Sequence, residues 1–335
     1  MWMTRLMESS AGLERPPQSD SSAYCCLLDE QPTHLVPERL LRQLRAMEQA
    51  GEPSFNGHSY MGRCVPETLR AAEMSLAEIF GNELPAVWIQ DPATEVWWPF
   101  ALSEGLRELV ASLKNQPVAI AELPTSIKNL LIHAGILVSP DHASQRRSAW
   151  NETASRCRGE FREKGYAVVD GWIHPFQLAE MRRYFRRQIR TGKVRLGDGQ
   201  SPLRYIAHND PVARFFHVQL TKAVSDLVGE RVKPSYVYMA SYVGGAQLEK
   251  HTDREQCELS ITFCLDYAPE PSEVTPWPLY LDTSRGTTTV HQAIGDGLLY
   301  RGRRLPHYRK TLAQGNTSTS LFLHYVAEDF AGALE

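Results

Sequence analysis

The chain has 335 residues, a formal net charge of −3 and a pI near 6.4. Hydrophobic residues make up 42% and charged residues 22% of it, an ordinary balance for a soluble globular protein with a sizeable core. This balance argues against a general nucleic-acid binder, and no apolar run approaches the roughly 20 residues of a membrane helix. The first residues lack the apolar core of a signal peptide, so we expect a cytoplasmic protein.

The N-terminal part of the sequence predicts a tail followed by a mostly helical domain. Residues 1–22 are polar and rich in Ser, Pro and Glu, which indicates a flexible tail. Within residues 23–145, apolar residues recur at helical spacing in segments 37–51, 66–81, 103–116 and 123–140. We expect Thr125 or Ser126 to cap the last of these helices. The segment SFNGHSYMGRC indicates a loop, and the polar stretch SPDHASQRRS marks the end of the domain.

The remaining residues, 146–335, change from helical to β pattern. Two helices are expected first, separated by a short strand from Tyr166 to Val169. After Pro234, short apolar segments alternate with turn residues, and we expect strands at 234–243, 258–267, 278–282, 287–294, 296–302 and 318–326. Such a series favours a barrel or sandwich over a parallel sheet.

The six cysteines form no CxxC pair and match no zinc spacing, so we expect reduced thiols: Cys25, Cys26, Cys64, Cys157, Cys257 and Cys264.

A histidine and an aspartate lie two residues apart in the stretch EKHTDREQCELS. His251 and Asp253 share one side of an extended chain, where they could form an exposed ion pair or part of a metal site. His307, which follows a strand that ends in turn residues, supplies a third ligand for the second interpretation. Two histidines and one carboxylate are the facial triad typical of non-haem Fe(II). His291 and His324 are interpreted as core or surface histidines.

Residues 161–325 resemble the iron(II)- and 2-oxoglutarate-dependent oxygenases, most nearly the prolyl-4-hydroxylase-like branch. The matching residues are HTD at 251–253, the strand GDGLLYRG at 295–302, and His307 after a gap of 53 residues. The resemblance implies an α+β protein with a double-stranded β-helix (jelly-roll) core and supporting helices. It also implies bound Fe(II), with 2-oxoglutarate and dioxygen as co-substrates, and His251, Asp253 and His307 as the catalytic metal ligands.

The co-substrate site departs from the family pattern. Tyr242 precedes His251 by nine residues, where related hydroxylases keep a tyrosine that hydrogen-bonds the co-substrate. Ser320 matches the serine that often accompanies the family's last-strand arginine or lysine, but Ser318 stands in the position of that cation. A carboxylate buried without a cation is costly. Arg309 is therefore our first candidate for the cation that binds the 2-oxoglutarate carboxylate, and Lys310 and Arg254 are the next candidates.

Several other segments allow two interpretations. If residues 318–324 form one extended strand, His324 lies on the same inward face as Ser318 and Ser320 and could line the pocket beside the metal site. The segment RYIAHNDPVARFFH could form a substrate lip or a helix start capped before Pro211. The arginines of MRRYFRRQIR are expected on a solvated helix face, and Trp97 and Trp98 in the core.

The sequence therefore predicts a dioxygenase that hydroxylates a C–H bond, with an amino-acid side chain in a peptide, protein or small molecule as substrate. The alternative is a non-catalytic module that binds metal or 2-oxoglutarate as a sensor, with a partner-binding helical domain. Repair of nucleic acid is disfavoured by the net charge.

Overall fold

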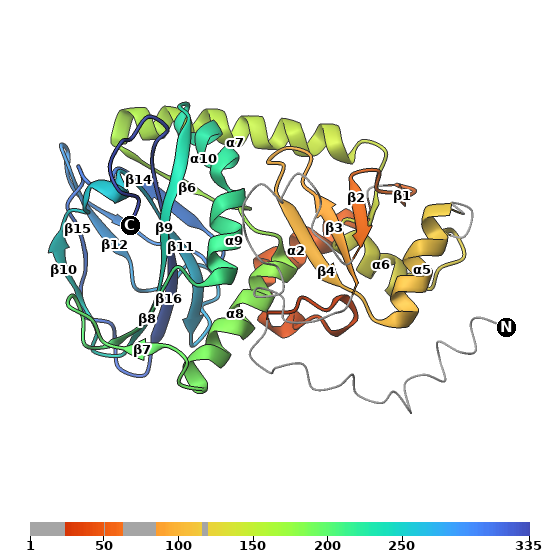
Figure 1. Ribbon diagram of the computed structural model, residues 1–335, viewed down its shortest axis with the longest axis horizontal. Coiled ribbons are helices and arrows are strands. Elements are labelled where there is room, and N and C mark those ends of the chain that lie inside the picture. The colour runs from red at the N-terminus through yellow and green to blue at the C-terminus, as the bar shows by residue number, and fades with distance from the viewer. Residues whose placement is uncertain (1–23, 50, 63–84, 116–119) are drawn as a thin grey trace.

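The computed structural model describes residues 24–49, 51–62, 85–115 and 120–335 (Figure 1). A β-barrel built from the C-terminal half lies beside the N-terminal region, and the long helix α7 (His142–Lys164) runs along both of them. Among the described residues, no helix has the length and apolar character needed to cross a membrane.

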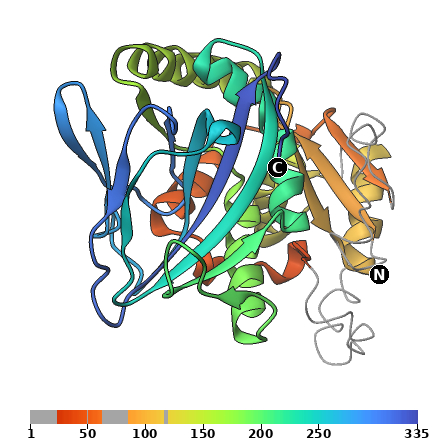
Figure 2. The same cartoon turned by 60° about the vertical axis from the view of Figure 1, so that its left-hand side comes forward.

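Two antiparallel sheets face each other in the barrel (Figure 2). The larger sheet has the order β6-β14-β11-β16-β9-β8-β7, and the smaller one the order β10-β15-β12-β13. The strands of the larger sheet are β6 (Tyr166–Val169), β7 (Arg195–Leu196), β8 (Arg204–His208), β9 (Val232–Val243), β11 (Leu259–Ala268), β14 (Gly297–Tyr300) and β16 (Thr317–Ala327). Those of the smaller sheet are β10 (Leu248–His251), β12 (Leu279–Thr283), β13 (Gly286–Val290) and β15 (His307–Arg309).

The chain moves back and forth between the two sheets from β9 to β16, which is the topology of a double-stranded β-helix. The fold expected from the sequence is confirmed. Each expected strand after Pro234 is present, although His291 lies just beyond the end of β13 instead of within it.

Helix α8 (Pro175–Arg190) covers the outer face of β11, so that this central strand is buried along nearly its whole length. The helix begins where the His174 side chain accepts a hydrogen bond from the Phe176 amide and Pro175 fixes the first turn. Arg182 is fully buried and, with Arg186, binds the Asp266 carboxylate of β11. The expectation of a solvated arginine face was wrong here, because the tertiary fold supplies acidic partners.

Three further helical segments complete the barrel: α9 (Pro211–Gln219), α10 (Thr221–Val228) and the short η5 (Glu255–Cys257). The Asp210 side chain accepts hydrogen bonds from the amides of Val212 and Ala213 at 3.0 and 3.1 Å. The capped helix start after residue 209 is therefore confirmed.

The N-terminal region contains helices η2 (Leu28–Glu30), η3 (Thr33–Leu35), α2 (Glu38–Met47), α5 (Glu104–Asn115) and α6 (Thr125–His133). Its strands are β1 (Ser54–Phe55), β2 (Ser59–Gly62), β3 (Ala86–Gln90), β4 (Trp97–Ala101) and β5 (Leu137–Val138). The helices expected in segments 37–51, 103–116 and 123–140 are present as α2, α5 and α6, although α6 ends at His133 and β5 follows within the last segment. The tail 1–22, Cys64 and the helix expected at 66–81 lie outside the described residues; the described cysteines are free thiols.

Two local predictions in this region were wrong. SFNGHSYMGRC is not all loop, because β1 pairs with β5 and β2 pairs with β3, and these distant partners supply hydrogen bonds that no local pattern reveals. Helix α6 has no side-chain cap, since Pro124 takes the capping position and Thr125 is already helical.

The N-terminal region packs against α8 and α9 and shares one hydrophobic core with the barrel. Trp98 is buried and its ring stacks on Phe216 at 5.9 Å, which confirms its place in the core. The Tyr24 hydroxyl donates to Gln177 Oε1 at 2.6 Å. The boundary predicted near residue 145 falls in the first turn of α7.

Candidate metal and co-substrate site

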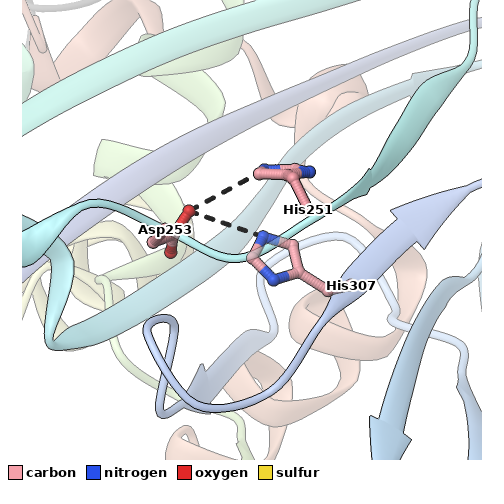
Figure 3. Close-up of side chains that lie close together, drawn as sticks. All are labelled: His251, Asp253 and His307. Atoms are coloured by element: carbon pink, nitrogen blue, oxygen red, sulfur yellow. Dashed lines mark ion pairs between the residues drawn. The ribbon is translucent and has the colours of Figure 1, made fainter.

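The three ligands expected from the sequence meet at one end of the smaller sheet (Figure 3). His251 ends β10 and pairs in register with His307, which begins β15. Asp253 lies two residues past His251, and its Oδ1 is 3.8 Å from His251 Nε2 and 3.5 Å from His307 Nε2. One ligand atom from each residue lies within 4.8 Å of the others.

Both histidines are oriented by backbone carbonyls. His251 Nδ1 lies 2.8 Å from the Glu249 carbonyl, and His307 Nδ1 lies 3.0 Å from the Leu305 carbonyl. A carbonyl can only accept a hydrogen bond, so each Nδ1 carries a proton and each Nε2 is the nitrogen that faces Asp253. The Tyr300 hydroxyl also lies 3.5 Å from His307 Nε2. Burial lowers the pKa of His307, although Asp253 opposes this shift, and the neutral ring is thereby favoured.

The site therefore brings two imidazole lone pairs and a carboxylate oxygen together. All three are hydrogen-bond acceptors, and such a group is unfavourable unless a cation lies between them. Two histidines and one carboxylate on one side, with a cavity on the other, fit Fe(II) with coordination positions left open. The donor set fits the metal that the fold implies.

Asp253 is held by residues that the sequence did not reveal. Its Oδ2 accepts a hydrogen bond from the Ser260 hydroxyl at 2.6 Å, and Ser260 Oγ in turn lies 3.0 Å from His324 Nδ1. Because the serine proton points at the carboxylate, His324 must donate from Nδ1. A Cβ at Gly302 would lie 2.1 Å from Asp253 Oδ2, so the last glycine of GDGLLYRG leaves room for the ligand.

A cavity of about 420 Å³ opens beside the triad. His324 lines it, as the strand phase with Ser318 and Ser320 predicts, and so do Tyr242 and Tyr300. His291 lies apart from it, with Nδ1 2.9 Å from the Thr275 carbonyl. The interpretation of His291 as a histidine outside the site is confirmed.

Arg309 is a buried cation that has no acidic partner among the described residues. It lies two residues after His307 on the same inward face of β15 and is only 5% exposed. Its Nη1 donates to the Trp277 carbonyl at 2.6 Å, and its guanidinium lies 4.6 Å from the Trp277 ring centroid. No carboxylate of the described residues forms an ion pair with it. Burial lowers its pKa, and a cation in this position is costly unless an anion joins it.

Arg204 is a second buried arginine, and it lines the cavity itself. Its Nη1 donates to the Tyr242 hydroxyl at 2.8 Å, while its Nε lies 3.1 and 3.0 Å from the two carboxylate oxygens of Asp198. Burial opposes the ionisation of Asp198, but hydrogen bonds from Arg204 and Tyr238 lower its pKa to about 2. The charge of Arg204 is thus already neutralised. The sequence places Arg204 in a possible substrate lip, but the ion pair of Arg204 with Asp198 could not be predicted from it.

Of the remaining candidates, Arg254 lines the cavity, whereas Ser320, Ser318 and Lys310 do not. Ser320 is buried and pairs across the sheet with Ala240 and Cys264, and Ser318 lies opposite Tyr242. Neither serine is among the residues that line the cavity. Lys310 is exposed, with its Nζ 4.8 Å from the Tyr280 ring centroid.

No model of a known protein family matches the chain, and no curated protein matches it. About half of the chain is similar in structure to prolyl hydroxylases and other 2-oxoglutarate-Fe(II) oxygenases. A Pseudomonas putida prolyl-4-hydroxylase is 13% identical, with a TM-score of 0.44, over 52% of this chain and 99% of that one. A Trichoplax adhaerens prolyl hydroxylase, solved with a hypoxia inducible factor peptide, is 14% identical, with a TM-score of 0.46, over 55% and 94%. An oxidoreductase of the 2-oxoglutarate-Fe(II) oxygenase family from Burkholderia pseudomallei is 15% identical, with a TM-score of 0.42, over 54% and 92%.

Proposed function

We propose that the protein is an Fe(II)- and 2-oxoglutarate-dependent dioxygenase that hydroxylates a C–H bond, with an amino-acid side chain as the substrate group. One observation carries the proposal: two imidazole nitrogens and a carboxylate oxygen converge within 4.8 Å of one another beside a cavity. Bound iron, together with 2-oxoglutarate and dioxygen, would supply the oxidation of an unactivated C–H bond.

The residues of the site divide into three roles. His251, Asp253 and His307 hold the metal and leave its remaining positions facing the cavity. Backbone carbonyls fix the tautomers of the two histidines. The hydrogen bond from Ser260 orients the Asp253 carboxylate toward the proposed metal position.

Arg309 is the proposed partner for the remote carboxylate of 2-oxoglutarate. It lies behind the part of the cavity wall formed by Tyr242 and Tyr300, with which it interacts electrostatically. Its charge has no counterion among the described residues, whereas the charge of Arg204 has one. Tyr242 completes the proposed co-substrate site, with its hydroxyl free to donate while it accepts from Arg204. Ser320, the other residue that the family pattern assigns to this site, does not line the cavity.

The test is an anaerobic Fe(II) titration with and without 2-oxoglutarate, followed through the visible metal-to-ligand charge-transfer band of the chelate. We expect the wild-type protein to form the band, His251→Ala to lose it with the metal, and Arg309→Gln to need at least about tenfold more 2-oxoglutarate. Arg285→Gln, which removes an exposed ion pair with Glu163, is the matched control and should behave like wild type. Succinate formation under air then measures turnover.

A second candidate function is a metal-binding sensing module without turnover. The absence of a cation at Ser318, inside the last strand, favours it. Bound iron without a charge-transfer band, or with a band but without succinate under air for any substrate, would support the sensing module and contradict the oxygenase.

A further inference from the structure

Of the four charged side chains that line the cavity, one arginine has no ion-pair partner among the described residues. Two carboxylates and two arginines line it: Asp198, Asp253, Arg204 and Arg254. Asp198 is paired with Arg204, and Asp253 belongs to the metal triad. Arg254 forms no ion pair with any residue in the described part of the chain. One permanent cation at the cavity thus lacks a counterion.

The contacts of Arg254 orient its guanidinium without neutralising it. Its Nε donates to the Tyr236 hydroxyl at 3.2 Å, and its guanidinium lies 4.5 Å from the Tyr236 ring centroid. Arg254 also interacts with the thiol of Cys257, whose sulfur lies 2.9 Å from the Tyr236 hydroxyl. Burial raises the pKa of Cys257 to about 12 and also raises the pKa of Tyr236, so both groups are uncharged near neutral pH.

An aromatic wall continues from Arg254 into the cavity. The Tyr236 ring lies 4.7 Å from the His324 ring and 5.2 Å from the His208 ring, centroid to centroid. All of these side chains line the cavity. Because Arg254 lines the same cavity as the triad, an anion bound to its guanidinium would share that cavity with the metal, with this wall along the rest of the molecule.

We propose that the substrate is a small organic acid whose carboxylate pairs with Arg254 while its carbon skeleton lies along Tyr236 toward the triad. This inference rests on the proposed function and names the substrate class of the same site. The cavity of about 420 Å³ falls within the range of roughly 300–1,000 Å³ typical of small-molecule sites. Arg309 and Arg254 then bind different carboxylates, one of the co-substrate and one of the substrate.

The test uses protein loaded with Mn(II), which replaces iron without turnover, and with 2-oxoglutarate. The probes are free amino acids, their N-acetyl derivatives and the carboxamide of each, and binding is measured by thermal shift and then by calorimetry. We expect at least one acid to bind about 10- to 100-fold more tightly than its amide, as a charge-assisted hydrogen bond requires. Binding of free amino acids would indicate a free acid as the substrate, whereas binding of N-acetyl acids alone would indicate the carboxyl end of a peptide. Both kinds of substrate carry the same carboxylate.

Arg254→Gln should remove the preference for acid over amide and weaken the binding of the acid by a similar factor. Because Arg254 is exposed, the variant should fold, and its affinity for Mn(II) and 2-oxoglutarate should match that of the control Arg285→Gln. Three results would overturn the inference: no acid in the panel binds, amides bind as tightly as acids, or Arg254→Gln weakens 2-oxoglutarate instead of the acid. A missing charge-transfer band in the wild-type protein would instead refute the proposed function, so the two failures are distinguishable.

Discussion

Ser260→Ala removes the hydrogen bond that supports the metal-binding carboxylate. The serine hydroxyl is fully buried and lies 2.6 Å from Asp253 Oδ2, with His324 Nδ1 behind it at 3.0 Å. Without the hydroxyl, Asp253 Oδ2 loses its hydrogen-bond donor, and no other side chain of the described residues donates to that oxygen. The carboxylate then rotates more freely, and its energetic cost of burial rises.

The size of the effect follows from two independent ranges. A hydrogen bond to a charged group contributes about 1.5–3 kcal/mol. Loss of an outer-shell partner typically lowers metal affinity about 10- to 100-fold, which corresponds to roughly 1.4–2.8 kcal/mol. The ranges overlap almost completely, so we expect Ser260→Ala to weaken Fe(II) binding by about 10- to 100-fold.

The assay is an anaerobic Fe(II) titration by calorimetry, repeated with Co(II) for its absorption spectrum. Ser241→Ala is the matched control, because that buried serine hydroxyl lies 2.8 Å from Thr319 Oγ1 and touches no ligand. Equal metal affinities for Ser260→Ala and wild type would refute the assignment of Ser260 as a positioning residue. A loss of equal size in Ser241→Ala would assign the effect to the barrel as a whole.

Three further substitutions have defined outcomes. Gly302→Ala places a Cβ 2.1 Å from Asp253 Oδ2 and should weaken Co(II) binding more than Ser260→Ala does; unchanged Co(II) affinity would contradict the packing argument. Burial raises the pKa of Glu180 to about 7, so its contribution to stability is present below its unfolded pKa of about 4.5 and is lost as the pH rises through 7. Glu180→Gln should therefore raise the free energy of unfolding at pH 8, by up to about 3 kcal/mol, and change it little at pH 4, which urea unfolding at the two pH values measures. Tyr242→Phe removes the hydroxyl that accepts from Arg204 and should raise the KM for 2-oxoglutarate about tenfold at unchanged metal affinity, and an unchanged KM would exclude that hydroxyl from the co-substrate site.

Local sequence patterns were sufficient for several helices and for the proposal of a metal triad. Helices α2, α5, α6 and α8 follow from apolar residues at helical spacing, which depends on neighbours within one or two turns. His251 and Asp253 share a side because side chains alternate along an extended chain, and the cross-strand pairing of His251 with His307 completes the triad that the spacing indicated. The strand series after Pro234 predicted a barrel or sandwich, and the double-stranded β-helix was what the family resemblance implied.

Only the tertiary structure decided which charges have partners. Arg182 was expected in solvent, but the fold buries it against Asp266, 84 positions away in the chain. Ser260 and His324 are 64 positions apart and meet only because β11 and β16 pair. Arg309 and Arg254 show the opposite outcome, since each is placed beside the cavity with no acidic side chain to pair with among the described residues. The energy of a charge depends on its burial and on every group around it, and these surroundings are assembled from distant segments that no local pattern records.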